Sequence, residues 1–327
     1  MNDFVDFQKR IGWQGDVKLL LLKVCNDYQI GKYRGHEIIP LGYEDFNLVL
    51  ATDKGTFFVK VFGDFRDVKN CKRYIEIMER VIDAGVKHPA LYESPQGYLY
   101  QTEFDSVPIR LCLMRYIDGK SLYDLRTKVK LSGVSFFAKQ AALINQINFL
   151  PEKVYDSWAI VNFPEEYAKK KHYLDEEDKK LIKPLAQTFS LLRIADLPHC
   201  FVHGDILKTN VLRDRSGNLF VVDFSVANTS PRIQELAVLL CNVLFDEDDP
   251  ASFKDYYDLT LSEYQKYIPL APKELSAMPL FVQAAHAMHV IGAMYQKIAH
   301  ENNTPENEYW LNLGKIGLRY TTQLWPA

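Results

Sequence analysis

The sequence predicts an α+β protein: an N-terminal antiparallel sheet with one packed helix, followed by a mostly helical C-terminal part. Two observations support this prediction. Runs of β-branched and aromatic residues separated by turn residues fill residues 31–117. From residue 118 onward, apolar residues recur at three- and four-residue steps over long stretches. We therefore expect two lobes, residues 1–117 and 118–327, with the boundary near 117–120 and a ligand-binding cleft between the lobes.

The elements of the N-terminal lobe follow from turn and stop signals. Thr52-Asp53-Lys54-Gly55 has the Asp and Gly of a tight hairpin, so the flanking apolar runs are predicted to form two paired strands. After residue 67 the apolar period changes to that of a helix, and Gly85 stands where a helix stop is expected. The predicted elements are helices at about 16–28 and 67–84, three strands within 31–62, and strands at 97–104 and 109–117.

The C-terminal lobe is predicted from six long helical patterns and one short stretch of strands. This stretch, residues 200–227, contains two short apolar runs around the turn Asp214-Arg215-Ser216-Gly217-Asn218. Loops on such a stretch often carry function. The six helices are expected at about 135–149, 175–194, 231–245, 252–267, 272–299 and 306–320.

Composition and charge exclude several classes of protein. The 327 residues contain 39 Lys and Arg against 42 Asp and Glu, a formal net charge of -3, so nothing indicates a nucleic-acid partner. The five cysteines form no CxxC pair, which speaks against a disulfide framework or a zinc site. The first residues lack the pattern of a secretory signal, and the apolar runs are too short or too charged to span a membrane. We expect a soluble, cytoplasmic protein without a membrane partner.

The strongest functional signal is the stretch from His203 to Asn210, which reads HGDILKTN, together with Asp223 after the following turn. Phosphoryl transfer requires a carboxylate near the attacking hydroxyl and oxygen ligands for Mg²⁺ between the phosphates. Asp205 would orient the acceptor hydroxyl and accept its proton, while Asn210 and Asp223 would hold the metal. Because Asn210 and Asp223 lie on the two arms of one predicted hairpin, we expect the three side chains to come together.

This stretch resembles the catalytic loop of the aminoglycoside phosphotransferase and choline kinase superfamily, in which His-Gly-Asp is followed after four residues by Asn and then by a metal-binding Asp. The resemblance extends over nearly the whole chain, and segments 269–281 and 306–311 are similar to the homoserine kinase-like branch. It implies a bilobal protein-kinase-like fold with a nucleotide-binding lobe at 1–117. The helical lobe at 118–327 would carry the catalytic loop and the substrate site. The resemblance also implies ATP and Mg²⁺ as cofactors, Asp205 as the catalytic residue, and Asn210 and Asp223 as the metal ligands.

Lys60 is the expected nucleotide-binding lysine. In the segment FFVKVF, residues 57–62, it alternates out of phase with its apolar neighbours on the third strand. The resemblance places there the lysine that binds the α- and β-phosphates of ATP. A carboxylate on the following helix would fix its ammonium, and Glu76 is the first candidate for this partner, with Glu79 the second.

Three further positions are assigned to ATP by the resemblance. Gly42 lies in the expected phosphate loop, residues 40–47, which has this one Gly in place of the GxGxxG of protein kinases. A plain turn between strands is the alternative for this loop. Met114 and Tyr116, in the expected hinge at 113–122, would offer backbone groups to the adenine.

Two residues near the motif are expected to support the catalytic loop. Glu235 stands where members of the superfamily have Asp, and it would hold the backbone of the loop. His203 is expected to be a hydrogen-bond partner within the loop, because Asp205 already fills the role of the base. Lys208 would either contact the γ-phosphate or be a solvated lysine.

Two other groups have a structural alternative to a functional role. His286 and His289 lie three residues apart on a predicted helix without a third ligand beside them, so a packed or solvent-facing pair is expected. The acidic run Asp246–Asp249 is expected to be a solvated loop, with contact to a cationic substrate as the alternative.

The predicted function is an ATP- and Mg²⁺-dependent phosphotransferase that moves the γ-phosphate to a hydroxyl of a small molecule. By the resemblance, the first acceptor to consider is a small amino alcohol or a homoserine-like metabolite, and the second is an aminoglycoside. A nucleotide-binding pseudokinase that acts as a scaffold is a further alternative, although no catalytic or metal residue is lost. A protein kinase is disfavoured, because the segment after Asp223 is too short for a long activation loop.

Overall fold

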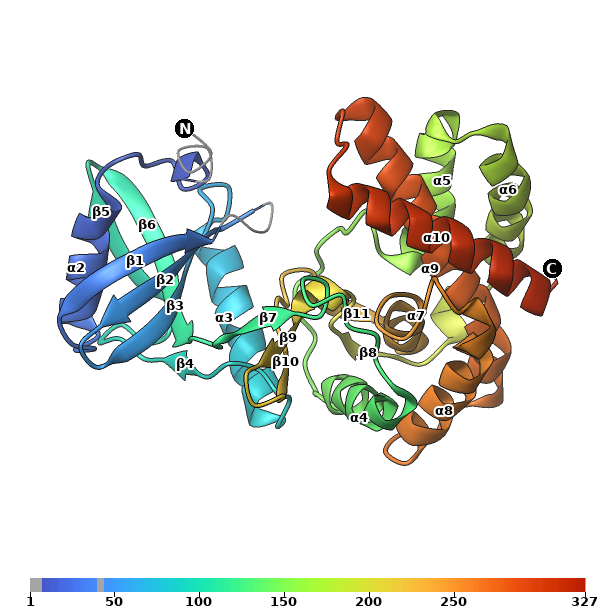
Figure 1. Ribbon diagram of the computed structural model, residues 1–327, viewed down its shortest axis with the longest axis horizontal. Helices are drawn as coiled ribbons and strands as arrows, with labels where there is room; N and C mark the ends of the chain where they lie inside the picture. Colours follow the sequence, from blue (N-terminus) through green and yellow to red (C-terminus); the bar gives the residue numbers. More distant parts are fainter. Residues whose placement is uncertain (1–7, 40–43, 327) are drawn as a thin grey trace. The chain divides into compact units, whose positions relative to one another are not determined.

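The computed structural model describes residues 8–39 and 44–326. The chain divides into two compact units, residues 1–120 with 212–222 and residues 121–211 with 223–327 (Figure 1). The first unit is built on an antiparallel sheet and the second is mostly helical, as the sequence predicts. The segment 212–222, which the sequence pattern assigns to the C-terminal part, belongs to the first unit.

The first unit contains a larger antiparallel sheet and a smaller three-stranded sheet. Its elements are α2 (Val17–Asp27), β1 (Tyr33–Ile39), β2 (Phe46–Thr52), β3 (Gly55–Val61), α3 (Val68–Asp83), β4 (Leu91–Tyr92), β5 (Tyr100–Phe104), β6 (Val107–Arg115), β7 (Gly119–Ser121), β9 (Val211–Asp214) and β10 (Leu219–Val221). The larger sheet has the order β1-β2-β3-β6-β4, with β5 also paired to β6. The smaller sheet has the order β10-β9-β7.

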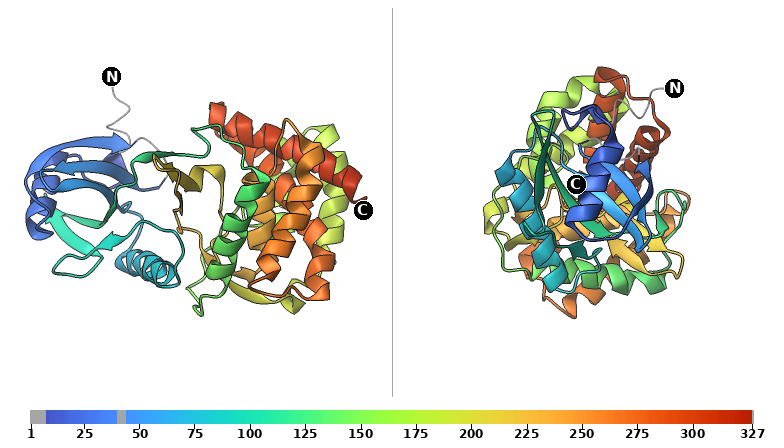
Figure 2. Two further views of the ribbon diagram at one scale, coloured as in Figure 1. Left: turned by 60° about the horizontal axis from the view of Figure 1, so that its bottom comes forward. Right: turned by 90° about the vertical axis from the view of Figure 1, so that its left-hand side faces the viewer.

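The alternation of side chains along β3 separates the two faces of the larger sheet. Phe57, Val59 and Val61 lie in one apolar cluster with the residues of α2, whereas Phe58 and Phe62 pack with those of α3. The two helices therefore cover opposite faces of the sheet (Figure 2). The sequence predicts both helices but only the second as packed on the sheet, and the structure shows that α2 is packed there as well.

The second unit consists of helices around a short two-stranded sheet. Its elements are α4 (Val134–Asn145), α5 (Phe163–Lys170), α6 (Glu176–Ser190), β8 (His199–Val202), β11 (Asn228–Pro231), α7 (Ile233–Asn242), α8 (Phe253–Gln265), α9 (Pro272–Ala299) and α10 (Pro305–Leu324). β8 and β11 pair in antiparallel fashion. The sequence pattern does not predict α5, β8 or β11, because elements of eight and four residues are too short to show a period clearly.

α9 is the core helix of the second unit. Helices α5, α6, α7 and α10 pack against it. Within the described ranges it is the one helix long and apolar enough to cross a membrane, but 83% of its most apolar window is buried inside the protein, as in a core helix. The contact with α10 is close at two glycines. A Cβ at Gly314 would lie 2.7 Å from the His289 Cβ, and one at Gly317 would overlap the His286 ring.

Candidate active site

The catalytic-loop motif lies in the second unit, directly after β8. Pairing with β11 fixes the strand up to Val202, and the loop 203–210 begins at the next residue. The Asp205 side chain is half-buried. Asn210 Nδ2 donates hydrogen bonds to Asp205 Oδ2 at 2.8 Å and to the Asp205 carbonyl oxygen at 2.9 Å. The structure thus brings the predicted base together with one of the predicted metal ligands.

Two contacts fix the backbone of this loop. Gly204 has a φ of +80°, which residues with a side chain rarely adopt, and its N–H donates to Glu235 Oε2 at 3.1 Å. The Asp205 N–H donates to His203 Nδ1 at 3.1 Å. Glu235, fully buried on α7, therefore holds the loop backbone, and His203 is a hydrogen-bond partner within the loop. Both contacts agree with the sequence-based expectation.

The carboxyl groups around Asp205 change its acidity. Burial raises the pKa of Asp205 to about 8, and the negative charges of Asp156 and Asp223 act in the same direction. Burial likewise raises the pKa of Glu235 to about 7. Asp156 lies far from the motif in the chain, and no sequence signal points to it. A carboxyl group whose pKa is raised by burial and by neighbouring carboxylates is typical of a functional site.

The residues predicted to hold a metal provide an incomplete set of ligands. No group of three or more His, Cys, Asp or Glu side chains that could hold a metal occurs within residues 8–39 and 44–326. Asn210 directs its amide nitrogen to Asp205, so its amide oxygen is the atom that would face a cation. With the Asp223 carboxylate this gives two oxygen donors. They fit Mg²⁺, which in nucleotide sites takes its other ligands from phosphates and water.

Lys60 lies in the first unit, on the face of the sheet that α3 covers. Its strand neighbours Val59 and Val61 are buried on the opposite face, so Lys60 alternates out of phase with them, as predicted. Its Nζ forms an ion pair with Asp45 Oδ2 at 2.9 Å and lies 5.3 Å from the centre of the Tyr74 ring. Its contact with the phosphates of ATP stays a prediction.

The predicted pairing of Lys60 with Glu76 is wrong. Glu76 is exposed on α3, and its carboxylate pairs with Arg80 one turn along the helix, at 2.7 Å. Glu79, the second candidate, has its pKa raised by burial and by neighbouring carboxylates, opposite to the effect of a lysine partner. The physical reason is the helical period, because α3 turns a different set of residues toward the sheet. This buried set includes Cys71, Tyr74, Ile75 and Met78.

Asp45 is the carboxylate that Lys60 contacts instead. It precedes β2 and is 5% exposed. Its Oδ1 accepts hydrogen bonds from Arg66 Nε and from the Gly63 N–H, both at 3.0 Å. Burial alone would raise the pKa of Asp45, but the charges of Lys60 and Arg66 outweigh it and hold the pKa below its ordinary value. The sequence does not single out Asp45, because an acidic residue before a strand is equally typical of a turn.

The remaining residues assigned to ATP also stay predictions. Met114 is buried in β6, where it pairs with Phe58 of β3 and with Leu91 of β4. Tyr116 follows directly after that strand. Gly42 lies outside the described residues.

Lys208 is buried, so the alternative of a solvated lysine is wrong. Its side chain is 8% exposed, and its Nζ donates to the Tyr309 hydroxyl of α10 at 2.8 Å. Glu247 Oε2 lies 3.8 Å away. The Tyr123 N–H also donates to the Lys208 carbonyl oxygen at 3.1 Å. The hydrogen bond from Lys208 to Tyr309 thus connects the catalytic loop to α10, two residues before Asn210.

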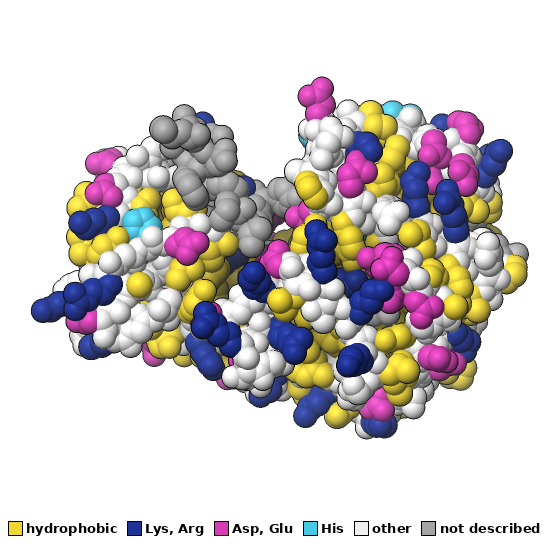
Figure 3. All heavy atoms as spheres, viewed as in Figure 1, with side chains coloured by type: hydrophobic (Ala, Val, Ile, Leu, Met, Phe, Trp, Pro, Cys, Tyr) yellow, Lys and Arg dark blue, Asp and Glu magenta, His cyan; other side chains and the backbone are white. Residues whose placement is uncertain are grey.

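The acidic run Asp246–Asp249 is partly neutralised. Lys128 Nζ pairs with Asp246 Oδ1 at 2.8 Å and with Asp248 Oδ2 at 3.0 Å. The charges of Lys128 and of Lys208 hold the pKa of Asp246 below its ordinary value, against the opposing effect of its burial. Figure 3 shows basic and acidic side chains interspersed over the helical unit on the face in view. Asp248 and Asp249 are exposed, as expected for a solvated loop, whereas Asp246 is more buried.

His286 and His289 are packed residues of α9. His286 Nδ1 lies 3.0 Å from Cys241 Sγ. Burial lowers the pKa of His286 to about 3 and that of His289 to about 4, so both imidazoles are neutral at pH 7. This confirms the packed alternative for the pair.

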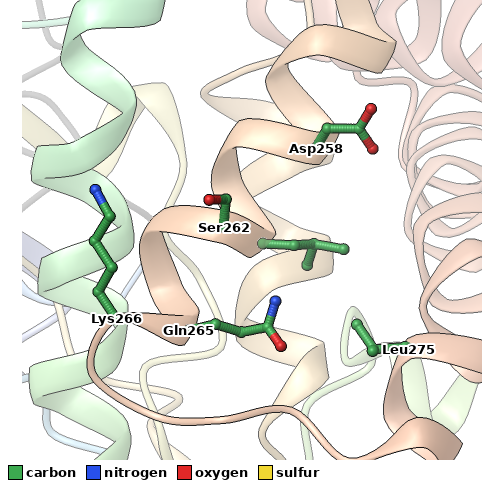
Figure 4. A pocket seen from close by; sticks show the side chains of 6 residues that line it. Asp258, Ser262, Gln265, Lys266 and Leu275 are labelled. Carbon is green, nitrogen blue, oxygen red and sulfur yellow. The ribbon is translucent and has the colours of Figure 1, made fainter.

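An open hollow on the second unit contains none of the motif residues. It lies between α8 and the start of α9 (Figure 4). Its lining residues are Asp258, Leu261, Ser262, Gln265, Lys266 and Leu275. The candidate site is therefore the catalytic loop with its neighbours, and this hollow is not part of it.

Known proteins are similar to the chain in sequence over most of its length. The sequence model of the phosphotransferase enzyme family matches residues 36–270, more than half of the chain. A homoserine kinase of Parvibaculum lavamentivorans is 23% identical over 290 residues, covering 84% of each chain. A homoserine kinase of Methylobacillus flagellatus is 21% identical over 270 residues, covering 79% of this chain and 78% of that protein.

Solved structures share the fold at low sequence identity. A microcompartment-associated aminopropanol kinase has a TM-score of 0.68 at 12% identity, covering 94% of this chain and 98% of that one. The amicoumacin kinase hAmiN, in complex with AMP-PNP and Ca²⁺, has a TM-score of 0.66 at 15% identity, covering 97% and 96%. At these identities the likeness establishes the bilobal, kinase-like fold of the chain.

Proposed function

The chain belongs to the phosphotransferase enzyme family, and on that premise we propose that it uses ATP and Mg²⁺ to phosphorylate a hydroxyl of a small molecule. The observation that carries the proposal is the contact of Asn210 with Asp205 in a loop whose backbone Glu235 holds. Phosphoryl transfer needs positioning and charge stabilisation, and this loop supplies a fixed carboxylate with a neutral amide beside it.

Asp205 is the proposed base. The acceptor oxygen attacks the γ-phosphorus, and its proton passes to an Asp205 carboxylate oxygen. The bond between the γ-phosphorus and the oxygen that bridges to the β-phosphate breaks, so ADP leaves. Because Asn210 donates to Oδ2, Oδ1 is the oxygen that would receive the proton. A base is most effective when its pKa lies near the working pH, and the pKa of about 8 fits that requirement.

The phosphates are assigned to Lys60 and to the metal ligands. Lys60 would bind the α- and β-phosphates through its ammonium, and Asn210 and Asp223 would hold Mg²⁺. When bound, Mg²⁺ neutralises the charge that develops on the phosphate oxygens. Besides burial, the negative charges of Asp156 and Asp223 raise the pKa of Asp205. A bound divalent cation would offset this accumulation of negative charge, which supports the proposed metal.

The proposed acceptor is a homoserine-like amino alcohol. The relatives are named homoserine kinases, and one structural neighbour is an aminopropanol kinase. The charges point the same way. A polycationic aminoglycoside would need open carboxylates, whereas Asp246 and Asp248 are already paired with Lys128. An aminoglycoside is therefore the second choice.

The deciding experiment measures ADP release with ATP and Mg²⁺ over a panel of hydroxyl compounds. The panel contains homoserine, 1-amino-2-propanol, choline, ethanolamine, hexosamines and aminoglycosides, and Asp205→Asn is the matched blank. We expect homoserine or a similar amino alcohol to be turned over. Turnover of aminoglycosides alone would contradict the acceptor assignment and make Asp246–Asp249 the first specificity site to test. ATP binding without any turnover would favour the scaffold alternative.

A further inference from the structure

We propose that Asp45, instead of a carboxylate on α3, is the residue that positions Lys60 for the phosphates of ATP. The inference deepens the proposed function and rests on it, because binding of ATP by Lys60 is part of that function. Asp45 acts through Lys60 and is therefore a positioning residue. The ion pair seen in the structure points to Asp45.

The contacts of Asp45 join three successive parts of the first unit. Its Oδ2 binds Lys60 Nζ of β3 at 2.9 Å. Its Oδ1 accepts from Arg66 Nε and from the Gly63 N–H, both in the loop that leads to α3. Asp45 itself directly precedes β2, whose pairing with β3 sets Phe46 opposite Val61. With one oxygen on Lys60 and the other on that loop, the carboxylate has little freedom to turn.

Burial makes this pair strong and specific. The side chains of Lys60 and Asp45 are 8% and 3% exposed, so water competes little for either charge. Breaking a buried pair by removing one partner leaves an uncompensated charge. The Lys60 ammonium also faces the Tyr74 ring of α3, which offers no negative charge of its own. The Asp45 carboxylate, at the start of β2, therefore sets the direction in which the Lys60 side chain points.

An ion pair of Lys60 with Asp45 affects nucleotide binding differently from an ion pair with a Glu on a helix. In protein kinases a Glu on the corresponding helix holds the lysine, so movement of that helix controls ATP binding. In this chain Glu76 is exposed and paired with Arg80 on its own helix. The ion pair with Asp45 links the position of Lys60 to the start of β2.

Nucleotide binding with and without phosphates tests the proposal. The dissociation constants of AMP-PNP with Mg²⁺ and of adenosine are measured by titration calorimetry for the wild type, Asp45→Asn and Glu76→Gln. Asp45→Asn should weaken AMP-PNP binding about tenfold or more, since a hydrogen bond to a charged group contributes on that scale. Adenosine lacks phosphates, so its affinity should stay within about twofold. Glu76→Gln is the matched control and should leave both affinities unchanged.

Several outcomes would overturn the proposal. Equal losses for AMP-PNP and adenosine would show that Asp45 only supports the fold of its unit. Unchanged or tighter AMP-PNP binding in Asp45→Asn would show that the carboxylate is irrelevant or competes with the phosphates. If Asp45→Asn does not fold, Asp45→Glu replaces it, because it keeps the charge but moves the carboxylate by one methylene, and the same selective loss is expected. A wild type that binds no AMP-PNP would refute the proposed function itself.

Discussion

At the scale of residues, buried Asp45 and half-buried Asp205 differ in the direction of their pKa shifts because their neighbours differ. Asp45 lies between Lys60 and Arg66, and these cations hold its pKa below the ordinary value. Asp205 has the carboxylates of Asp156 and Asp223 near it, and burial together with these charges raises its pKa to about 8. Asp45 therefore stays anionic and holds other groups, while Asp205 is able to take up a proton. The surroundings, more than the residue type, assign the two roles.

Substitution of Asp205 and of Lys60 should separate catalysis from nucleotide binding. Asp205→Asn removes the base but keeps the shape of the side chain, so turnover should fall by about 10²–10⁴-fold while the Kd of ATP changes little. Lys60→Met removes a charge from the phosphates, so the Kd of ATP should rise about tenfold or more. Steady-state kinetics and calorimetry measure the two effects. An equal loss of ATP affinity in both variants would refute this division of roles.

At the scale of elements, the packing of α9 against α10 depends on two small residues. Gly314 and Gly317 sit one turn apart on α10, where the His286 and His289 side chains of α9 fill the space that a Cβ would need. Close approach lets the two helices bury these imidazoles, and the Cys241 thiol of α7 contacts His286 from the other side. The helices thus hold neutral polar groups inside an apolar core.

Gly317→Ala should destabilise the protein by about 1–3 kcal/mol, the usual cost of overpacking a core. The added methyl group would overlap the His286 ring, and α10 would have to shift. Urea unfolding at pH 7 measures the change. Gly35→Ala on β1 is the matched control, because a Cβ there meets nothing within 4 Å. Equal stability of the two variants would mean that α10 adjusts at no cost.

The two buried histidines should make the protein sensitive to acid. Their pKa values are lowered to about 3 and 4, so below pH 6.5 the unfolded chain binds protons that the native state does not. The contribution of the two neutral imidazoles to the free energy of unfolding is therefore complete above pH 6.5 and is lost as the pH falls toward about 4. Each imidazole contributes up to about 1.4 kcal/mol per pH unit in that window.

Unfolding in urea at pH 6.5 and pH 5 measures this dependence. His286→Leu should remove about half of the loss that the two imidazoles cause, because one of the two titrating groups is gone. His36→Gln is the control, since His36 is exposed on β1. An unchanged slope in His286→Leu would show that other groups cause the acid sensitivity.

At the scale of the whole molecule, the chain passes between the two units at the ends of the β9–β10 hairpin. Residues 212–222 belong to the first unit, where the Val221 N–H donates to the Lys87 carbonyl oxygen at 2.7 Å. Asn210 and Asp223, the predicted metal ligands, stand just outside the two ends of this segment. The placement of both ligands is thus linked to the hairpin and to its pairing partner β7.

Gly119→Ala tests this link. A Cβ at Gly119 in β7 would overlap the Arg213 carbonyl of β9 and lie 2.9 Å from the Asp214 Cα, so the strand pairing would have to open. We expect lower stability, by about 1–3 kcal/mol, and a smaller gain in ATP affinity on adding Mg²⁺. Calorimetry with and without Mg²⁺ measures the gain, and Asp223→Ala, which should abolish it, is the reference. A full gain in Gly119→Ala would show that the metal ligands do not depend on this pairing.

The sequence by itself determined the features that depend on local periods and short motifs. The alternation in residues 57–62 put Lys60 on the face of the sheet opposite the α2 core, and the HGDILKTN loop indicated Asp205 and Asn210 as neighbours. These two follow from the chain itself, because a strand period and a tight loop fix side-chain directions over a few residues. The hold of Glu235 on the loop backbone was implied by the family resemblance, and the structure shows the contact.

Only the tertiary structure decided which distant groups meet. Four findings depend on how the elements pack. Asp45 pairs with Lys60, and Asp156 lies near enough to Asp205 to affect its pKa. Lys128 pairs with the acidic run, and residues 212–222 belong to the first unit. The helical period of α3 turns its apolar residues to the sheet and leaves Glu76 exposed, but only the structure shows that Glu76 pairs with Arg80 and that Asp45 contacts Lys60. Two charged groups that are far apart in the chain form an ion pair only if the fold brings them close together. Packing of the apolar faces determines the distance between them.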